Sequence, residues 1–140
     1  AVTFVGGVPF DRVLAEYERA DVLVLPSQSE GWPKTLTEGM AFGLACIGPA
    51  RGVVPGMLAD GRGLTVAPGD VPALAAALGT LVGGPNVVAR RRDIAARAAA
   101  WASRFTRARF RDDLRQVLAV HWDGAPARPP IAGATIVAVR

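Results

Sequence analysis

The chain has 140 residues, of which 51% are hydrophobic, and it carries a formal net charge of +4. This length and apolar content suffice for one domain with a buried core, and they exclude a largely disordered chain. No apolar run approaches the roughly 18 residues that a membrane-spanning helix needs, so a protein built on such helices is excluded as well.

Charge is divided unevenly along the chain. Residues 1–85 hold five Lys or Arg and eight acidic residues, a net charge of −3, whereas residues 86–140 hold eleven Arg and four Asp, a net charge of +7. A basic segment can bind nucleic acid or anionic lipid, or it can present solvated helix faces. The arginines are not interleaved with base-stacking aromatic residues, which argues against nucleic acid. We expect solvated helix faces, with peripheral contact to acidic phospholipid as the second interpretation.

The first 25 residues predict a strand, a helix and a second strand. Val2–Val5 is a short strand that begins the chain without a basic leader region, and we expect the chain to be a piece of a longer protein. Residues 10–20 form an amphipathic helix, and the apolar run Val22–Leu25 predicts a buried strand. The packed side of the helix consists of Phe10, Leu14 and Tyr17.

The stretch from Pro26 to Gly43, PSQSEGWPKTLTEGMAFG, follows that strand directly. Pro33 suits the first turn of a helix, because its fixed φ is helical and its missing N–H would have had no partner there. We therefore expect a helix that starts near Trp32 or Pro33. The N–H groups of Trp32, Lys34 and Thr35 would then be free donors at the positive end of a helix dipole, beside the Lys34 ammonium group. This arrangement predicts a phosphate site.

Two acids, Glu30 and Glu38, flank this predicted phosphate site. Carboxylates repel phosphate, so phosphate affinity alone does not explain them. They accept strong hydrogen bonds from the hydroxyl groups of a sugar or a ribose. The pattern therefore indicates a ligand that combines phosphate with sugar hydroxyls.

The rest of the chain continues the alternation of strands and helices. Leu44–Ile47 and Leu64–Val66 predict strands, and Gly48–Gly63 between them is expected to be a loop of turn residues. Such alternation demands parallel strands with right-handed crossovers. The fold class is therefore α/β, with a Rossmann-like parallel sheet and helices on both faces. Ligands bind such sheets at the carboxyl ends of the strands, where residues 26–34 must lie.

Three helices are predicted after the last strand. The first spans residues 71–82 and is capped by Asp70, the second spans 86–103, and the third is capped by Thr106 and reaches His121. The arginines of the second helix, at positions 90, 91, 92 and 97, are expected to face mostly water. The core-facing positions are Leu74, Leu78 and Leu81 in the first helix, Val87, Ile94, Ala98 and Trp101 in the second, and Phe110, Leu114, Val117 and Leu118 in the third.

The two glutamates with their seven-residue spacer, the preceding "ADVLVLPS" and the following "AFG" resemble the retaining nucleotide-sugar glycosyltransferases of the GT-B fold. The resemblance is to the group 1, family 4-like enzymes, which include bacterial glycan-assembly enzymes, and it extends from about Val2 to Trp122. It implies that residues 1–122 are the C-terminal, donor-binding half of a GT-B fold without its first strand-helix unit. Residues 123–140 would be a Pro/Ala-rich linker and a strand-like tail.

The resemblance also implies an activity. This is transfer of a sugar from a nucleotide diphospho-sugar to a glycan or lipid-linked acceptor, with retention and without a cofactor or an essential metal. The acceptor would bind an N-terminal domain that this chain lacks. Glu30 would contact the donor sugar near the reacting centre and, with Lys34, would be catalytic, while Glu38 would hold the ribose. The donor-binding residues would be Glu30, Gly31, Trp32, Lys34, Thr35 and Glu38.

The chain departs from the family pattern at three places. Pro33 stands where many members have glycine, and Gly39 stands where a small helix former such as alanine is usual. The segment Gly52–Gly56 is a degraded form of the family's Gly-Gly-x-Pro-Glu loop, without the second glycine and the glutamate. A ligand role for this loop is therefore weakened, and we expect its glycines to serve turns with positive φ.

Other residues support simpler interpretations. The single cysteine, Cys46, lies in an apolar run and is expected to be a buried core residue in a cytoplasmic, reducing setting, with the inner face of the membrane as the place of any lipid contact. His121 is expected to face solvent at a helix end, and no cluster has metal-ligand spacing.

Two alternatives to an enzyme stay open: a module that binds nucleotide without transfer, and an α/β interaction domain whose two glutamates are ordinary solvated acids.

Overall fold

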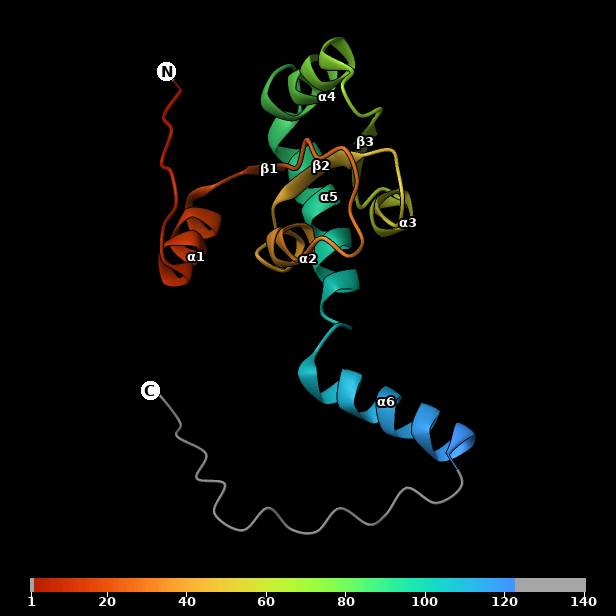
Figure 1. Cartoon of the computed structure of the whole chain (residues 1–140). Helices are drawn as coiled ribbons and strands as arrows, with labels where there is room; N and C mark the ends of the chain where they lie inside the picture. Colours follow the sequence, from red (N-terminus) through yellow and green to blue (C-terminus); the bar gives the residue numbers. More distant parts are fainter. Residues whose placement is uncertain (1, 123–140) are drawn as a thin grey trace. The chain divides into compact units, whose positions relative to one another are not determined.

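The computed structural model describes residues 2–122 (Figure 1). The chain divides into two compact units, residues 1–104 and 105–140. The predicted linker and strand-like tail at 123–140 lie outside the described residues. The elements of the first unit are α1 (Phe10–Arg19), β1 (Val22–Val24), α2 (Lys34–Ala41), β2 (Ala45–Pro49), α3 (Val54–Leu58), β3 (Gly63–Val66), α4 (Val71–Val82) and α5 (Val87–Ala102). The second unit holds α6 (Arg107–His121).

The three strands form a parallel sheet in the order β1-β2-β3. Cys46 of β2 is paired with Leu23 of β1 on one side and with Gly63 of β3 on the other. Helix α4 lies over one face of the sheet, and α2 and α3 lie over the opposite face (Figure 1). The α/β, Rossmann-like parallel sheet predicted from the strand-helix alternation is thus confirmed.

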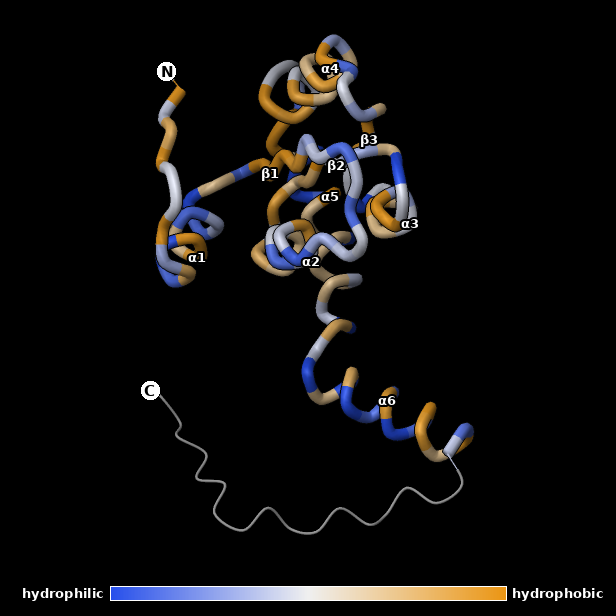
Figure 2. Tube along the Cα trace, viewed as in Figure 1, coloured by the Kyte–Doolittle hydropathy of each residue, from blue (hydrophilic) through white to orange (hydrophobic). Residues whose placement is uncertain are grey.

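Apolar side chains fill both faces of the central strand. All five residues of β2 are buried, and β1 and β2 are drawn largely in the colour of hydrophobic residues in Figure 2. Cys46 contributes to a core cluster with α2 and α3, whereas Ala45 and Ile47 contribute to a cluster with Leu81 of α4. A parallel strand covered on both faces is expected to be continuously apolar, as this one is. The helix positions in the two clusters include Leu36, Met40, Val54, Met57, Leu58, Leu74, Leu78, Ile94 and Ala98.

Gly39 lets α2 approach β1 closely. A β-carbon at this position would lie 2.5 Å from the Cδ2 atom of Leu23. A helix-forming alanine would therefore push the helix or the Leu23 side chain away. This close approach favours glycine at position 39.

The segment between β2 and β3 was predicted to be a loop, but its middle part forms the helix α3. The loop prediction was therefore wrong for these residues. α3 has Pro55 in its first turn and buries Val54, Met57 and Leu58. These three residues follow the i, i+3, i+4 spacing of a helix, but the run is only five residues long and is bounded by glycine and proline. Gly52, which precedes it, has a φ of +63°, as expected for a turn glycine.

The N-terminal segment differs from its prediction. Residues 2–7 form no strand, and Val2 and Phe4 are 84% and 94% exposed. A strand needs a neighbouring strand for its backbone hydrogen bonds, and β1 pairs only with β2 among the described residues. Helix α1 forms as predicted, with Tyr17 buried, but Phe10 at its start is exposed rather than packed.

The junction of α4 and α5 confirms one prediction and corrects another. The Asp70 side chain accepts a hydrogen bond from the Ala73 N–H at 2.9 Å and caps α4, as predicted. Arg91 does not face water: its side chain donates to the Leu81 carbonyl oxygen at 3.0 Å and pairs with Asp21 at 3.3 Å. A guanidinium group at the end of α4 satisfies a carbonyl oxygen that the helix leaves unpaired.

The second unit consists, in its described part, of the helix α6. The Thr106 hydroxyl accepts a hydrogen bond from the Arg109 N–H at 3.2 Å, which confirms the predicted cap. His121 is exposed in the last turn. The predicted apolar stripe is exposed along its length: Phe110, Leu114, Val117 and Leu118. Across residues 2–122, no single helix is long and apolar enough to cross a membrane, and α4 and α5 pass that test only when joined across a bend of 103°.

Candidate functional site

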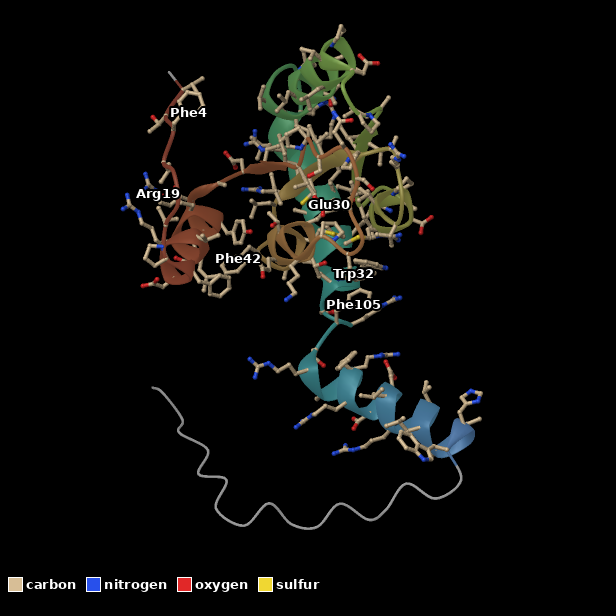
Figure 3. All side chains as sticks on the ribbon, in the orientation of Figure 1. Phe4, Arg19, Glu30, Trp32, Phe42 and Phe105 are labelled. Atoms are coloured by element: carbon tan, nitrogen blue, oxygen red, sulfur yellow. The ribbon has the colours of Figure 1, made fainter. Side chains whose placement is uncertain are left out.

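The loop between β1 and α2 starts at the carboxyl edge of the sheet. The Leu25 N–H donates to the Ile47 carbonyl oxygen at 2.9 Å and extends the ladder one residue beyond β1. The chain then leaves the sheet and runs to α2, with Glu30 and Trp32 along the way (Figure 3). Parallel sheets bind ligands at this edge, and the sequence placed residues 26–34 there.

Helix α2 begins at Lys34, one residue beyond the later of the two predicted starts. Pro33 precedes the first turn with an extended ψ of 102°, and its carbonyl oxygen accepts the first two helix hydrogen bonds, at 3.1 and 3.3 Å. Trp32 lies outside the helix, so its N–H is not one of the terminal helix donors. In the part of the chain that the structure describes, the N–H groups of Lys34 and Thr35 have no acceptor. These two donors stand at the positive end of the helix dipole.

The charged groups around this helix start are open to a ligand. Lys34 is exposed and forms no ion pair with any residue in the range 2–122. Glu30 is half-buried, and its carboxylate likewise has no ion-pair partner among these residues. Glu38 lies one turn after Lys34 on the same side of α2. The helix start can therefore offer two amides and one cation to an anion, and the acids can accept hydrogen bonds from hydroxyl groups.

Glu38 is held by Tyr17 of α1, a contact that the sequence analysis missed. The Tyr17 hydroxyl donates to the Oε2 atom of Glu38 at 3.3 Å. Burial raises the pKa of Tyr17, and the negative charge of Glu38 raises it further. The sequence indicated only that Tyr17 faces the core, because spacing along one helix carries no information about which residue of another helix it meets.

Glu30 is in contact with the loop after β2. A β-carbon on Gly52 would lie 3.0 Å from the Glu30 carbonyl oxygen. Glu30 therefore lies toward the loop that leads into α3, while Glu38 lies toward α1. Along the chain, Glu30 precedes the start of α2 and Glu38 lies in its second turn.

Trp32 ties the same loop to α5. Its ring stacks on the ring of Trp101, with centroids 6.2 Å apart and planes at 24°. The Arg62 guanidinium group lies over the Trp101 ring at 5.3 Å and also donates to the carbonyl oxygens of Met57 and Gly56. This stack anchors the loop that carries Glu30 and Lys34. The sequence shows that both tryptophans are present, but whether their rings are in contact depends on how α5 packs.

A cavity of about 210 Å³ lies further along the carboxyl edge of the sheet. It is bounded by residues at or just after the carboxyl ends of the three strands, and most of its wall is apolar. The sequence analysis gives Asp70 and Leu74 of its lining structural roles, as a helix cap and a core position, and predicts no ligand role for either. Its lining includes Ser27, Gln28, Pro49, Pro68, Asp70 and Leu74. For the range 2–122, no group of three or more His, Cys, Asp or Glu side chains could hold a metal ion.

Comparisons with known proteins identify the family and the fold. The family model described as glycosyl transferases group 1 matches residues 1–101, nearly the whole first unit. The structure is similar to sucrose-phosphate synthase from Thermosynechococcus elongatus, with a TM-score of 0.71 and 27% identity. That match covers 84% of this chain and 30% of the synthase chain, so this chain spans less than a third of it. No curated protein sequence matches the chain. The α/β sheet is thus similar to a fragment of a GT-B glycosyltransferase, and the chain belongs to the group 1 glycosyltransferases.

Proposed function

We propose that this chain binds the donor of a retaining glycosyltransferase, as the C-terminal domain of a GT-B enzyme. The donor is a nucleotide diphospho-sugar, and the acceptor is a glycan or a lipid-linked glycan bound by another domain. The observation that carries the proposal is the start of α2, where two unpaired amides and the unpaired Lys34 ammonium group lie between Glu30 and Glu38.

The diphosphate is placed at this helix start. The N–H groups of Lys34 and Thr35 point toward an anion at the positive end of α2, and a partly buried anion in such a place gains up to about 2 kcal/mol from the dipole. The Lys34 ammonium group adds a full charge. Negative charge grows on the phosphate as the sugar departs, so these groups stabilise the transition state more than the bound donor.

The two acids have different parts in the proposal. Glu30 accepts hydrogen bonds from hydroxyl groups of the donor sugar and stabilises the positive charge that develops at its anomeric carbon. Glu38 accepts hydrogen bonds from the ribose. The backbone of Gly31 and Trp32 lies between Glu30 and the helix start and faces the sugar. A cytoplasmic location and contact with the inner face of a membrane stay predictions from the sequence. The proposal does not depend on either of them.

Titration calorimetry with this chain tests the assignment. A panel of nucleoside diphosphates with different bases is compared with the corresponding nucleotide sugars. We expect Glu38→Ala to weaken the binding of both ligand classes, because both contain the ribose. Glu30→Ala is expected to spare the nucleoside diphosphate and to remove the additional affinity that the sugar provides.

Glu18→Ala is the matched control, because Glu18 is an exposed acid on α1 outside the site. Binding that is equal in all three variants and the unchanged chain would reject the roles assigned to the two acids. The second candidate, a nucleotide-binding module without transfer, shares the helix start and Glu38. It predicts that the sugar adds no affinity and that Glu30→Ala therefore changes nothing.

A further inference from the structure

Tyr17 joins α1 to the acid that the proposed function assigns to the ribose. The residue is 7% exposed, and its hydroxyl donates to the Oε2 atom of Glu38 at 3.3 Å. Glu38 lies on α2, four residues after Lys34. The hydroxyl therefore contacts a residue of the proposed donor site, although Tyr17 itself belongs to a different helix.

The hydroxyl is a permanent donor at neutral pH. Burial raises the pKa of Tyr17, and the negative charge of Glu38 raises it again, so the phenol keeps its proton. A neutral donor can orient a carboxylate without cancelling its charge. The ring is held in place as well, with its centroid 5.5 Å from that of Phe42.

The contact uses one oxygen of the Glu38 carboxylate. Within residues 2–122, the hydrogen bond to Glu38 goes to Oε2, and Oε1 is left for a ligand. Anchoring one oxygen restricts rotation of the carboxylate, so the other oxygen is presented in one direction. At 3.3 Å the bond is longer than the usual O–H···O range of about 2.5–3.0 Å, so a modest effect is expected.

We propose that Tyr17 is a positioning residue, whose hydroxyl orients the Glu38 carboxylate to accept hydrogen bonds from the ribose of a bound nucleoside diphosphate. The inference rests on the proposed function and deepens it, because it makes Tyr17 a determinant of the choice between ribose and deoxyribose. Packing alone would stabilise α1 against α2 but would not select between these two sugars.

The test compares ribose selectivity in four chains: the unchanged chain, Tyr17→Phe, Glu38→Ala and the double variant. Each is titrated with the nucleoside diphosphate that binds most tightly and with its 2′-deoxy and 3′-deoxy forms. Tyr17→Phe keeps the ring and removes the hydroxyl. We expect it to lower affinity for the ribose form about threefold to tenfold, with little change for the deoxy form that lacks the hydroxyl held by Glu38. In the Glu38→Ala background, Tyr17→Phe should change nothing further.

Phe42→Leu is the matched control, because it alters the packing of the Tyr17 ring and leaves the hydroxyl in place. Its ratio of ribose to deoxyribose affinity should equal that of the unchanged chain. An unchanged ratio in Tyr17→Phe would overturn this inference and leave the proposed function standing. A chain that binds no nucleoside diphosphate at all would overturn the proposed function, and the inference with it.

A second measurement needs no substitution at position 17. Tyr17 is the single tyrosine of the chain, so 3-fluorotyrosine labelling places one fluorine signal beside this hydroxyl. The ribose form of the ligand should shift this signal more than the deoxy form does, and Glu38→Ala should remove the difference. Equal shifts for the two ligands would contradict the inference even if Tyr17→Phe fails to fold.

Discussion

The carbonyl oxygen of Glu30 lies 3.0 Å from the point that a β-carbon on Gly52 would occupy. The loops that leave β1 and β2 are therefore in contact beside the candidate site. Gly52 has a φ of +63°, a conformation that costs a residue with a β-carbon about 1–2 kcal/mol. A side chain at this position would strain its own backbone and displace the Glu30 loop.

Gly52→Ala is therefore expected to lower both the free energy of unfolding and the affinity for nucleotide sugar. Gly84→Ala is the matched control: Gly84 has a φ of +83°, but its β-carbon would meet nothing within 4 Å. Urea unfolding should show a loss of about 1–2 kcal/mol for Gly84→Ala and at least as large a loss for Gly52→Ala, whose β-carbon also meets the Glu30 carbonyl oxygen. Calorimetry should show weaker binding only for Gly52→Ala, and equal binding in the two variants would mean that the Gly52 contact does not position Glu30.

Lys34 is the only lysine in the chain, which allows a direct chemical test of the phosphate site. A phosphate bound at the start of α2 would cover the Lys34 ammonium group. We expect a saturating nucleoside diphosphate to slow acylation of Lys34 by an amine-reactive reagent, as measured by mass spectrometry. The corresponding nucleoside, which lacks phosphate, should not protect it. Protection by both ligands, or by neither, would argue against phosphate at this helix start.

Among the ion-paired arginines of the first unit, we expect Arg62 to contribute most to the free energy of unfolding. Its side chain is only 13% exposed, pairs with Asp60 at 2.7 Å, and donates to the carbonyl oxygens of Met57 and Gly56 at 2.8 and 2.7 Å. Arg62→Ala should lower the free energy of unfolding by about 2–3 kcal/mol, since a hydrogen bond from a charged group is stronger than one between neutral groups and this guanidinium group makes three of them. Arg97→Ala, which breaks an exposed pair with Asp93, should lower it much less. Equal losses in urea unfolding would show that the Arg62 network is not an anchor.

Cys46 gives a prediction for alkaline pH. Burial raises the pKa of its thiol to about 12, from an ordinary value of 9.0. Above pH 9 the unfolded chain loses the thiol proton and the folded chain keeps it, so rising pH favours unfolding. Relative to Cys46→Ala, the unchanged chain should lose about 1.4 kcal/mol of unfolding free energy between pH 8 and pH 10. The comparison cancels the contribution of Tyr17, which both chains share. A difference that does not vary with pH would mean that the thiol is accessible to water in the folded state.

The order and type of most elements follow from the sequence alone. The uninterrupted apolar runs at 22–25 and 44–47, the cap at Asp70 and the helical spacing of Leu74, Leu78 and Leu81 are local signals, and the structure confirms them. The parallel sheet follows from their alternation, because strands joined through helices must run in the same direction. The same local signals place Lys34 and the two glutamates around one helix start.

Local signals fail where a segment depends on partners that are distant in the chain. Val2–Val5 has the composition of a strand but lies unpaired, and α3 lies in a stretch that reads as a loop. Arg91 has the pattern of a solvated arginine, yet it binds the end of α4 and Asp21. In each case the outcome is set by contacts across the fold.

The sequence by itself therefore determined the α/β class, because residue type and spacing specify the strands and helices, and its motif resembles the family that the comparisons show. The residues that would meet a phosphate and a sugar stay a prediction. The tertiary structure decided which neighbours those residues have: Tyr17 beside Glu38, Gly52 beside Glu30, and Trp101 beneath Trp32. The physical reason is that one-dimensional periodicity specifies which face of an element is buried, whereas side-chain packing between elements selects the partner that this face meets.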